Sequence, residues 1–254
     1  MKLKLFLDTM EKIAPASLAY SFDNVGLLIG PDHEDVKNVL VALDLSDATA
    51  REAVSIGADL VLTHHPIMFN PVKHILPDDP EMSAAYILMR NGIGHFAAHT
   101  NLDKAQGGVN DVLADLIGLK DITADEREGL IRFGELQEQI PLTTFSQSCR
   151  DKLGVNVRYT GVPEALCKKI AVCGGAGNGL FDFVKEAHAD TFLTGEIKHS
   201  EAILYKNAGI SVITAGHYET ERCVLLPLIN RLQMMTDDVK YNLTQSESSY
   251  FCCI

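Results

Sequence analysis

The most constraining feature of this 254-residue sequence is that its two halves repeat one pattern. Residues 39–63 align with residues 170–194 at a constant offset and without gaps, so that ADLVLT falls on ADTFLT. Further along, residues 91–103 align with residues 208–221 if one glycine is inserted. Any two strand–helix–strand units share apolar strands, but here the polar residues that follow the strands coincide as well. The repeat therefore favours internal duplication into two similar lobes.

Hydrophobic periodicity alternates between strands and helices within the first half. Continuous apolar runs rich in β-branched residues predict buried strands, and amphipathic stretches between a polar start and a glycine predict helices. The expected strands are 38–44, 59–63 and 93–98, and the expected helices are 47–56, 81–91 and 109–117. Such alternation is typical of an α/β fold in which helices pack against a mainly parallel sheet.

The expected organisation is two similar three-layer α/β lobes. The first lobe covers residues 1–125 and the second covers residues 126–254, with a C-terminal segment that packs back on the first lobe. Residues 121–128 hold four acidic residues and one arginine, a composition that favours a solvated linker between the lobes. We expect the functional site in the cleft between the lobes.

Composition narrows the class of protein. Acidic residues outnumber basic ones 34 to 22, for a net charge of −12, which disfavours binding to nucleic acid. No apolar run approaches the length of about 20 residues that spans a bilayer, and Asp8 interrupts the apolar N-terminal stretch that a signal peptide would need. The six cysteines, which include Cys252 and Cys253, show no C-x-x-C spacing and indicate reduced thiols. We expect a cytoplasmic protein without membrane contact.

Histidines and carboxylates follow the predicted strands at the points where functional groups gather in parallel sheets. His64 and His65 come directly after the strand 59–63. The next strand is followed by His99 and, four residues later, by Asp103. The repeat places His217 and Glu221 at the same spacing in the second half. A spacing of four puts both side chains on one face if the segment begins a helix.

These six side chains suit a metal site. Imidazole nitrogen and carboxylate oxygen without thiolate favour Zn, Fe, Mn, Co or Ni. Six candidates are enough for two metal ions if a carboxylate bridges them, and such a pair can activate water while it polarises an oxygen. For any one histidine alone, a structural hydrogen bond is the simpler interpretation. The matched motifs at several strand ends favour the metal.

Five ordered motifs resemble the Nif-three-like family, whose members are often named GTP cyclohydrolase I type 2. They are DNVGLLIG (23–30), THHPIMF (63–69), HTNLD (99–103), GEIKH (195–199) and GHYETE (216–221). The resemblance runs from about residue 5 to residue 251 and identifies a short form without an inserted domain. It implies a two-lobed α/β fold, two divalent metal ions per subunit, and a homohexamer built as a trimer of dimers.

The resemblance also implies a ligand set. By position, the metal ligands are His64, His65, Asp103, His217 and Glu221. His99, in the same motif as Asp103, is a weaker candidate for a ligand or for a catalytic proton relay.

Weaker signals surround these motifs. The glycine run 174–179 after a predicted strand fits either a tight turn or a triphosphate cradle to which Gly175 and Gly177 contribute backbone N–H groups. Glu196 occupies the repeat position of His65 and precedes Lys198 and His199. This group fits either proton transfer by Glu196 with substrate contacts by its neighbours, or a solvated helix start. Asp23 fits either the cleft or a turn before an edge strand.

Two functions of different kinds agree with the sequence. One, which the resemblance implies, is a dinuclear-metal-dependent hydrolase that acts on a purine nucleotide, with opening of the GTP ring and loss of C8 as formate. The same residues also fit phosphoester or amide hydrolysis. The alternative is a non-catalytic metal-binding or regulatory assembly protein. Ligand saturation discriminates between them, because only a centre with an open coordination position leaves room for water and substrate.

Overall fold

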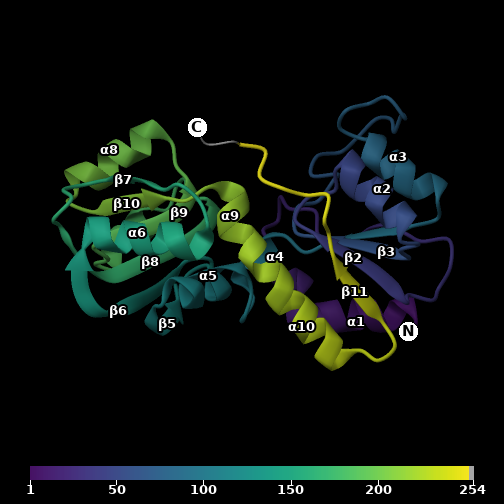
Figure 1. The fold of residues 1–254 in the computed structure, drawn as a ribbon, viewed down its shortest axis with the longest axis horizontal. Coiled ribbons are helices and arrows are strands. Elements are labelled where there is room, and N and C mark those ends of the chain that lie inside the picture. The colour runs from purple at the N-terminus through teal and green to yellow at the C-terminus, as the bar shows by residue number, and fades with distance from the viewer. Residues whose placement is uncertain (252–254) are drawn as a thin grey trace. The chain divides into compact units, whose positions relative to one another are not determined.

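The computed structural model describes residues 1–251, and Cys252 and Cys253 lie outside the described residues. The chain forms two compact units (Figure 1). Unit 1 consists of Met1–Gln106 and Leu225–Ser248, and unit 2 consists of Gly107–Val224 and the described residues from Ser249 on. Unit 2 is therefore inserted into unit 1, whereas the sequence led us to expect a single boundary near residue 125.

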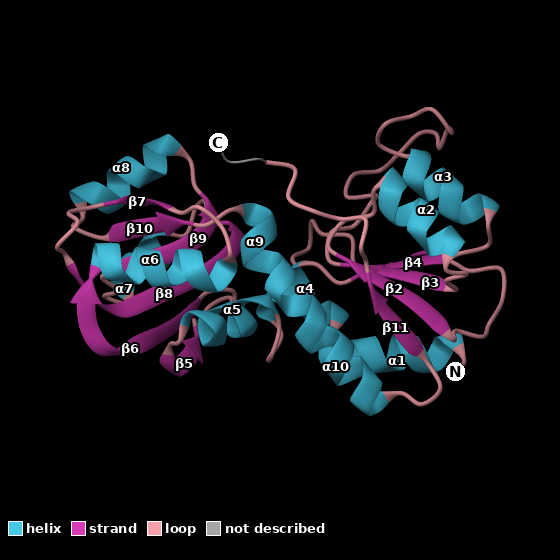
Figure 2. Ribbon diagram, in the orientation of Figure 1, coloured by secondary structure: helices cyan, strands magenta, loops and turns pink. Residues whose placement is uncertain are grey.

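Unit 1 is built on a five-stranded sheet. In spatial order its strands are β1 (Gly26–Ile29), β4 (Gly94–Ala97), β3 (Leu60–Thr63), β2 (Asn38–Ala42) and β11 (Lys240–Leu243). Its helices are α1 (Leu3–Ile13), α2 (Asp47–Ser55), α3 (Ser83–Arg90), α4 (Thr100–Lys104) and α10 (Leu225–Met235), with a short 3-10 turn at Ala16–Leu18. The sheet lies between α2 and α3 on one face and α1 and α10 on the other (Figure 2).

Both faces of this sheet are buried, which explains the continuous apolar runs in the sequence. Leu40 and Val61 point into the cluster that α2 and α3 cover with small alanine side chains. On the opposite face, Phe6 of α1 meets Phe96 of β4 edge to face, with ring centroids 5.7 Å apart. Because neighbouring residues of a strand face opposite ways, almost every position of β2 and β3 must be apolar.

Unit 2 is built on a six-stranded sheet. In spatial order its strands are β5 (Lys120–Ala124), β6 (Arg132–Pro141), β8 (Leu166–Ala176), β9 (Thr191–Glu196), β10 (Ser211–Thr214) and β7 (Arg158–Thr160). Its helices are α5 (Val109–Ile117), α6 (Leu142–Leu153), α7 (Phe181–Glu186), α8 (His199–Asn207) and α9 (His217–Glu221), and a 3-10 turn follows at Arg222–Val224. Two apolar clusters, one on each face, hold α5 and α6 on one side and α7 and α8 on the other. The mixed α/β class and all six elements expected in residues 38–117 are confirmed.

The two units share the topology of four strands, and the rest of the two sheets differs. In each, three parallel strands run in the order first, second, third, and an antiparallel strand closes the outer edge of the third. The register agrees as well, because Val41 pairs with Leu62 in unit 1 and Val172 pairs with Leu193 in unit 2, the residues that the sequence alignment superposes. This agreement is what duplication would leave, and duplication itself stays a prediction.

The C-terminal segment completes unit 1. Strand β11 joins the sheet parallel to β2, so that the end of the chain lies beside one of its first strands (Figure 1). Beyond it, the carboxylate of Glu247 accepts hydrogen bonds from the backbone N–H groups of Leu43 and Asp44, at 2.9 and 2.6 Å. The segment is thereby fastened directly next to the C-terminal end of β2.

The acidic stretch 121–128 is not the linker that its composition indicates. Its first residues form β5, an exposed edge strand paired antiparallel with β6. Asp125 then folds the turn, because its carboxylate accepts hydrogen bonds from the N–H groups of Arg127, Glu128 and Ile131. Elsewhere, within residues 1–251, no helix has the length and apolar character needed to cross a membrane.

Candidate metal centre

Two histidines directly follow β3, and hydrogen bonds fix the orientation of their rings. The Nδ1 atom of His64 lies 2.8 Å from the carbonyl oxygen of Ala98, and Nδ1 of His65 lies 2.8 Å from a carboxylate oxygen of Asp44. A carbonyl can only accept, and an ionised carboxylate also accepts, so each ring donates through Nδ1–H. The Nε2 atom of each imidazole then carries the lone pair that a metal ion uses.

His99 follows β4 and is held in the same way. Its Nδ1 atom lies 2.8 Å from a carboxylate oxygen of Asp23, whose other oxygen accepts from the backbone N–H and the hydroxyl of Thr100. Burial raises the pKa of Asp23, but these hydrogen bonds from His99 and Thr100 outweigh it and hold the pKa well below its usual range. Asp23 is therefore an anion that orients His99.

The three rings form one compact cluster in unit 1. Their centroids lie 4.9 to 5.5 Å apart, and one possible ligand atom from each of His64, His65 and His99 lies within 4.8 Å of the others. Asp103 adds a carboxylate, with Oδ1 3.5 Å from Nε2 of His64. Metal-bound histidines typically donate their second N–H to a carboxylate or a backbone carbonyl, as all three do here. These side chains therefore fit a divalent metal ion.

Unit 2 presents a second set of the same chemistry at the end of β10. His217 begins α9, and its Nε2 atom lies 3.2 Å from a carboxylate oxygen of Glu221, four residues later. Its Nδ1 atom lies 3.0 Å from a carboxylate oxygen of Glu196 at the end of β9. His217 and Glu221 thus lie on one helical face, as their spacing predicts, and Glu196 contacts the same histidine.

The glycine run packs against this pair. Gly175 has a φ of +60°, and a Cβ at that position would overlap the Glu221 carboxylate and lie 3.1 Å from Nε2 of His217. Its N–H donates to the hydroxyl of Thr220, and the N–H of Gly177 donates to the carbonyl of Glu196 at 2.9 Å. In this structure both N–H groups meet protein acceptors, so a contact of Gly175 or Gly177 with substrate stays a prediction.

Two further N–H groups of the run are occupied in the same manner. That of Gly174 donates to the side-chain oxygen of Asn110 at 2.7 Å, and that of Gly179 donates to the carboxylate of Glu201 at 2.8 Å. The turn is therefore held by its own backbone donors, and its shape brings Gly175 against Glu221.

Lys198 and His199 are exposed at the start of α8. The backbone N–H of Lys198 donates to the side-chain oxygen of Asn178, which ties the helix start to the glycine run. His199 lines a cavity of about 300 Å³ together with Arg158, Tyr159 and Thr214. Contact of Lys198 and His199 with a substrate stays a prediction.

Sequence reasoning missed Asp44 and left Asp23 undecided. Asp44 follows β2, the neighbour of β3 in the sheet, and this place at the C-terminal edge was the signal that could have assigned it to His65. Asp23 lies directly after a turn and before β1, the edge strand, as one interpretation predicted, and its carboxylate also contacts His99.

Two other ionisable side chains near these motifs, His95 and Cys223, are not candidate metal ligands. His95 of β4 is fully buried, its Nε2 atom lies 2.7 Å from the Thr63 hydroxyl, and burial lowers its pKa to about 3. Burial raises the pKa of Cys223 to about 12, so its thiol stays protonated at neutral pH. None of the four described cysteines is part of a disulfide, and their reduced state stays a prediction.

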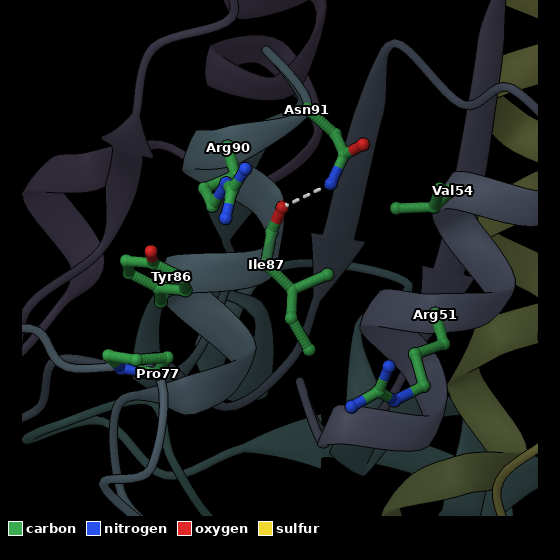
Figure 3. Close-up of a pocket in the computed structure, with 7 residues that line it drawn as sticks. All are labelled: Arg51, Val54, Pro77, Tyr86, Ile87, Arg90 and Asn91. Atoms are coloured by element: carbon green, nitrogen blue, oxygen red, sulfur yellow. Dashed lines mark hydrogen bonds between the residues drawn. The ribbon is translucent and has the colours of Figure 1, made fainter.

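A separate cavity of about 440 Å³ lies between α2 and α3 (Figure 3). Arg51 and Arg90 line it together with apolar side chains and Tyr86, and the amide of Asn91 donates to the carbonyl of Ile87 in its wall. The residues predicted for the functional site are not among those that line this cavity.

Comparison with known proteins agrees with the motifs. Residues 1–249 match the model of the family described as Duf34/NIF3 (NGG1p interacting factor 3). A protein of Clostridium perfringens named GTP cyclohydrolase 1 type 2 homolog is 32% identical, over 99% of both chains, and one of the same name from Lactococcus lactis is 31% identical, again over 99% of both. The crystal structure of the Staphylococcus aureus hypothetical protein SA1388 superposes with a TM-score of 0.92 at 27% identity, over 100% of this chain and 99% of that one.

Proposed function

The chain belongs to the DUF34/NIF3 family, and from this premise we propose that it is a dinuclear-metal-dependent hydrolase acting on a purine nucleotide, with ring opening of GTP as the reaction. One observation carries the proposal. Four imidazoles, those of His64, His65, His99 and His217, each have Nδ1 within 3.0 Å of an oxygen acceptor. Each of these rings therefore offers Nε2 as a ligand or as a base.

We assign two divalent ions to five ligands. These are His64, His65, Asp103, His217 and Glu221. The nitrogen and oxygen donors suit Zn, Fe, Mn, Co or Ni, and their oriented rings support tight binding. When bound, such a pair of ions supplies a water of lowered pKa and polarises a substrate oxygen.

The protein's own groups handle protons and orientation. Loss of C8 as formate needs two waters. The first adds at C8 and breaks the bond from C8 to one ring nitrogen, which leaves a formamide on the other nitrogen; the second hydrolyses that formamide, and each nitrogen that leaves C8 takes up a proton. His99 is the proton relay in this scheme, because the Asp23 carboxylate accepts from Nδ1–H and thereby fixes Nε2 as the atom that exchanges the proton. Glu196 orients His217 and is placed as a second proton carrier, and the groups assigned to substrate contacts are Gly175, Gly177, Lys198 and His199.

The test is formate release from GTP by protein loaded in turn with each metal. The His64→Ala variant should lose bound metal and formate release together, because its Nε2 atom is removed from the centre. His33→Ala is the matched control, since His33 pairs with Asp59 outside the cluster and should leave both unchanged. His99→Ala should reduce turnover more than metal content.

The same experiment distinguishes the hydrolase from the non-catalytic alternative. Protein that holds two metal ions per chain and releases no formate from GTP would reject the ring-opening reaction. Metal-handling or regulatory assembly would then become the leading function. Protein that binds no metal under any of these conditions would reject both.

We further propose that the chain self-associates as a homohexamer, a trimer of dimers, in the cytoplasm. Exposed apolar side chains support an interface on unit 2, where Val162 and Leu166 are 63% and 52% exposed in the loop before strand β8 and at its start. An interface between copies that covered these two side chains would remove their apolar surface from water, which favours association. Light scattering on the purified protein tests the assembly, and a monomeric mass would reject it.

A further inference from the structure

Unit 1 exposes two aromatic side chains beside its histidine cluster. Phe22 is 65% exposed and Phe69 is 42% exposed. Single exposed apolar residues are ordinary, but these two touch, with ring centroids 6.3 Å apart and planes at 63°. Phe22 directly precedes Asp23, and Phe69 belongs to the loop that begins with His64 and His65. Both phenylalanines are therefore carried by the segments that build the candidate metal centre.

The two rings belong to a longer row. Tyr20 stacks on Phe22 at 5.2 Å with an interplanar angle of 11°. At the other end, Phe69 meets the ring of His99 edge to face at 6.0 Å. Tyr20, Phe22, Phe69 and His99 thus form a continuous row of rings, the aromatic ledge, that ends inside the histidine cluster.

The ledge is held in place before any ligand arrives. The side-chain amide of Asn24 donates to the carbonyl of Met68 at 2.5 Å, which ties the Phe22 loop to the Phe69 loop. The N–H of Tyr20 donates to the hydroxyl of Thr100 at 3.1 Å. A surface that is already ordered loses little entropy when a ligand binds to it.

Charge and space beside the ledge fit a nucleotide. The ammonium group of Lys104 lies 3.4 Å from the centroid of the Tyr20 ring and brings positive charge to the end remote from His99. Phe69 also lines a cavity of about 580 Å³ with Ile67 and Lys73, and the acidic Asp79 and Glu81 of the same loop line it as well. This volume lies within the range of about 300–1,000 Å³ that is common for small-molecule pockets.

We propose that the aromatic ledge stacks the planar heteroaromatic base of the substrate, with Phe22 and Phe69 as the contact residues. The inference rests on the proposed function and adds the subsite that recognises the base. An aromatic face attracts any planar base, and each such stack is worth about 1–3 kcal/mol. A base on the His99 end of the ledge lies against the group assigned to proton transfer. The competing occupant is a second copy of this chain.

The experiment measures equilibrium binding of guanosine and of ribose 5-phosphate to the metal-loaded protein. Phe22→Ala and Phe69→Ala should weaken guanosine binding by about 5- to 150-fold, the equivalent of one lost stack. Both variants should bind ribose 5-phosphate as the unchanged protein does, because this probe has no base. Tyr86→Ala is the matched control, since it removes a ring from α3 outside the ledge.

Three results would overturn the proposal. They are guanosine binding that is equal in all variants, no guanosine binding by the unchanged protein at millimolar concentration, and a change of oligomeric state in Phe22→Ala without a change in guanosine binding. The last would assign the ledge to contact between copies. Formate release is read separately: its absence together with guanosine binding that depends on the ledge would reject ring opening and keep the base subsite.

Discussion

The packing of Gly175 against the Glu221 carboxylate makes a matched pair of substitutions informative. Gly175 and Gly179 belong to the same turn and both have positive φ, +60° and +79°. A Cβ on Gly179 meets nothing within 4 Å, whereas a Cβ on Gly175 would overlap the carboxylate of Glu221. Gly175→Ala and Gly179→Ala therefore share the backbone strain and differ in the contact with a proposed metal ligand.

The magnitude follows from these two parts. An alanine in the left-handed region costs roughly 1–2 kcal/mol, so both variants should lose about that much free energy of unfolding without metal. In Gly175→Ala the new Cβ also lies 3.1 Å from the carboxyl carbon of Glu221, where carbon atoms normally stay about 3.5–4.0 Å apart. Glu221 must move, and a displaced ligand should weaken metal binding about 10- to 100-fold, as loss of a supporting contact does.

The assay has two readouts. Urea unfolding of the metal-free variants measures the shared backbone cost, and competition with a chelator of known affinity measures metal binding by the folded protein. We expect similar unfolding free energies and a metal affinity that falls only in Gly175→Ala. Equal metal affinities for the two variants would refute the reasoning, because the position of Glu221 would then not matter for the metal.

Three further perturbations test other parts of the structure. Asp23→Asn should lower metal affinity or turnover about 10-fold or more while circular dichroism stays unchanged, because His99 loses its orienting anion; unchanged values of both would contradict this role. The folded chain resists protonation of His95, whose pKa is about 3, whereas the unfolded chain titrates near 6.5, so stability should fall below pH 6.5, by about 2 kcal/mol near pH 5. Urea unfolding near pH 7.5 and near pH 5 measures this loss, and His95→Asn should lose about 2 kcal/mol less unfolding free energy between the two pH values than the unchanged protein. An equal loss in both proteins would contradict the role of His95. Glu52→Ala removes the acceptor for three residues of the C-terminal segment and should cost about 1–3 kcal/mol, with faster proteolysis after β11; an unchanged cleavage rate would argue against this anchor.

The sequence was sufficient for the elements whose burial leaves a pattern. Strands β2 and β3 are buried on both faces, so their residues are apolar almost without interruption and could be located to within one or two positions. The histidines were found because each follows such a strand, where parallel sheets collect polar groups. Local pattern and strand order therefore locate the metal-binding candidates without a structure.

The partners of the histidines and the positions of β5 and β11 could not be predicted from local sequence patterns. Asp44 carries the signal of following a predicted strand, but its contact with Nδ1 of His65 also requires β2 to lie beside β3, which a local pattern does not specify. Strand β5 is exposed along most of its length, so it has no apolar alternation and resembles a linker. The packing of the C-terminal segment on the first lobe was predicted and is confirmed, but its parallel pairing with β2 joins residues about 200 positions apart, which periodicity does not report.

This return has a consequence for how the protein is made. The strand that completes the sheet of unit 1 and the Glu247 carboxylate that holds the N–H of Asp44 both come from the last part of the chain. A ribosome delivers residues 107–224 of unit 2 before these residues emerge. All residues of the unit 2 core are synthesised before β11, and until β11 is made the edge of β2 in unit 1 stays unpaired. The Glu247 carboxylate therefore reaches the backbone of Asp44, the partner of His65, only after residues 107–224 have been synthesised.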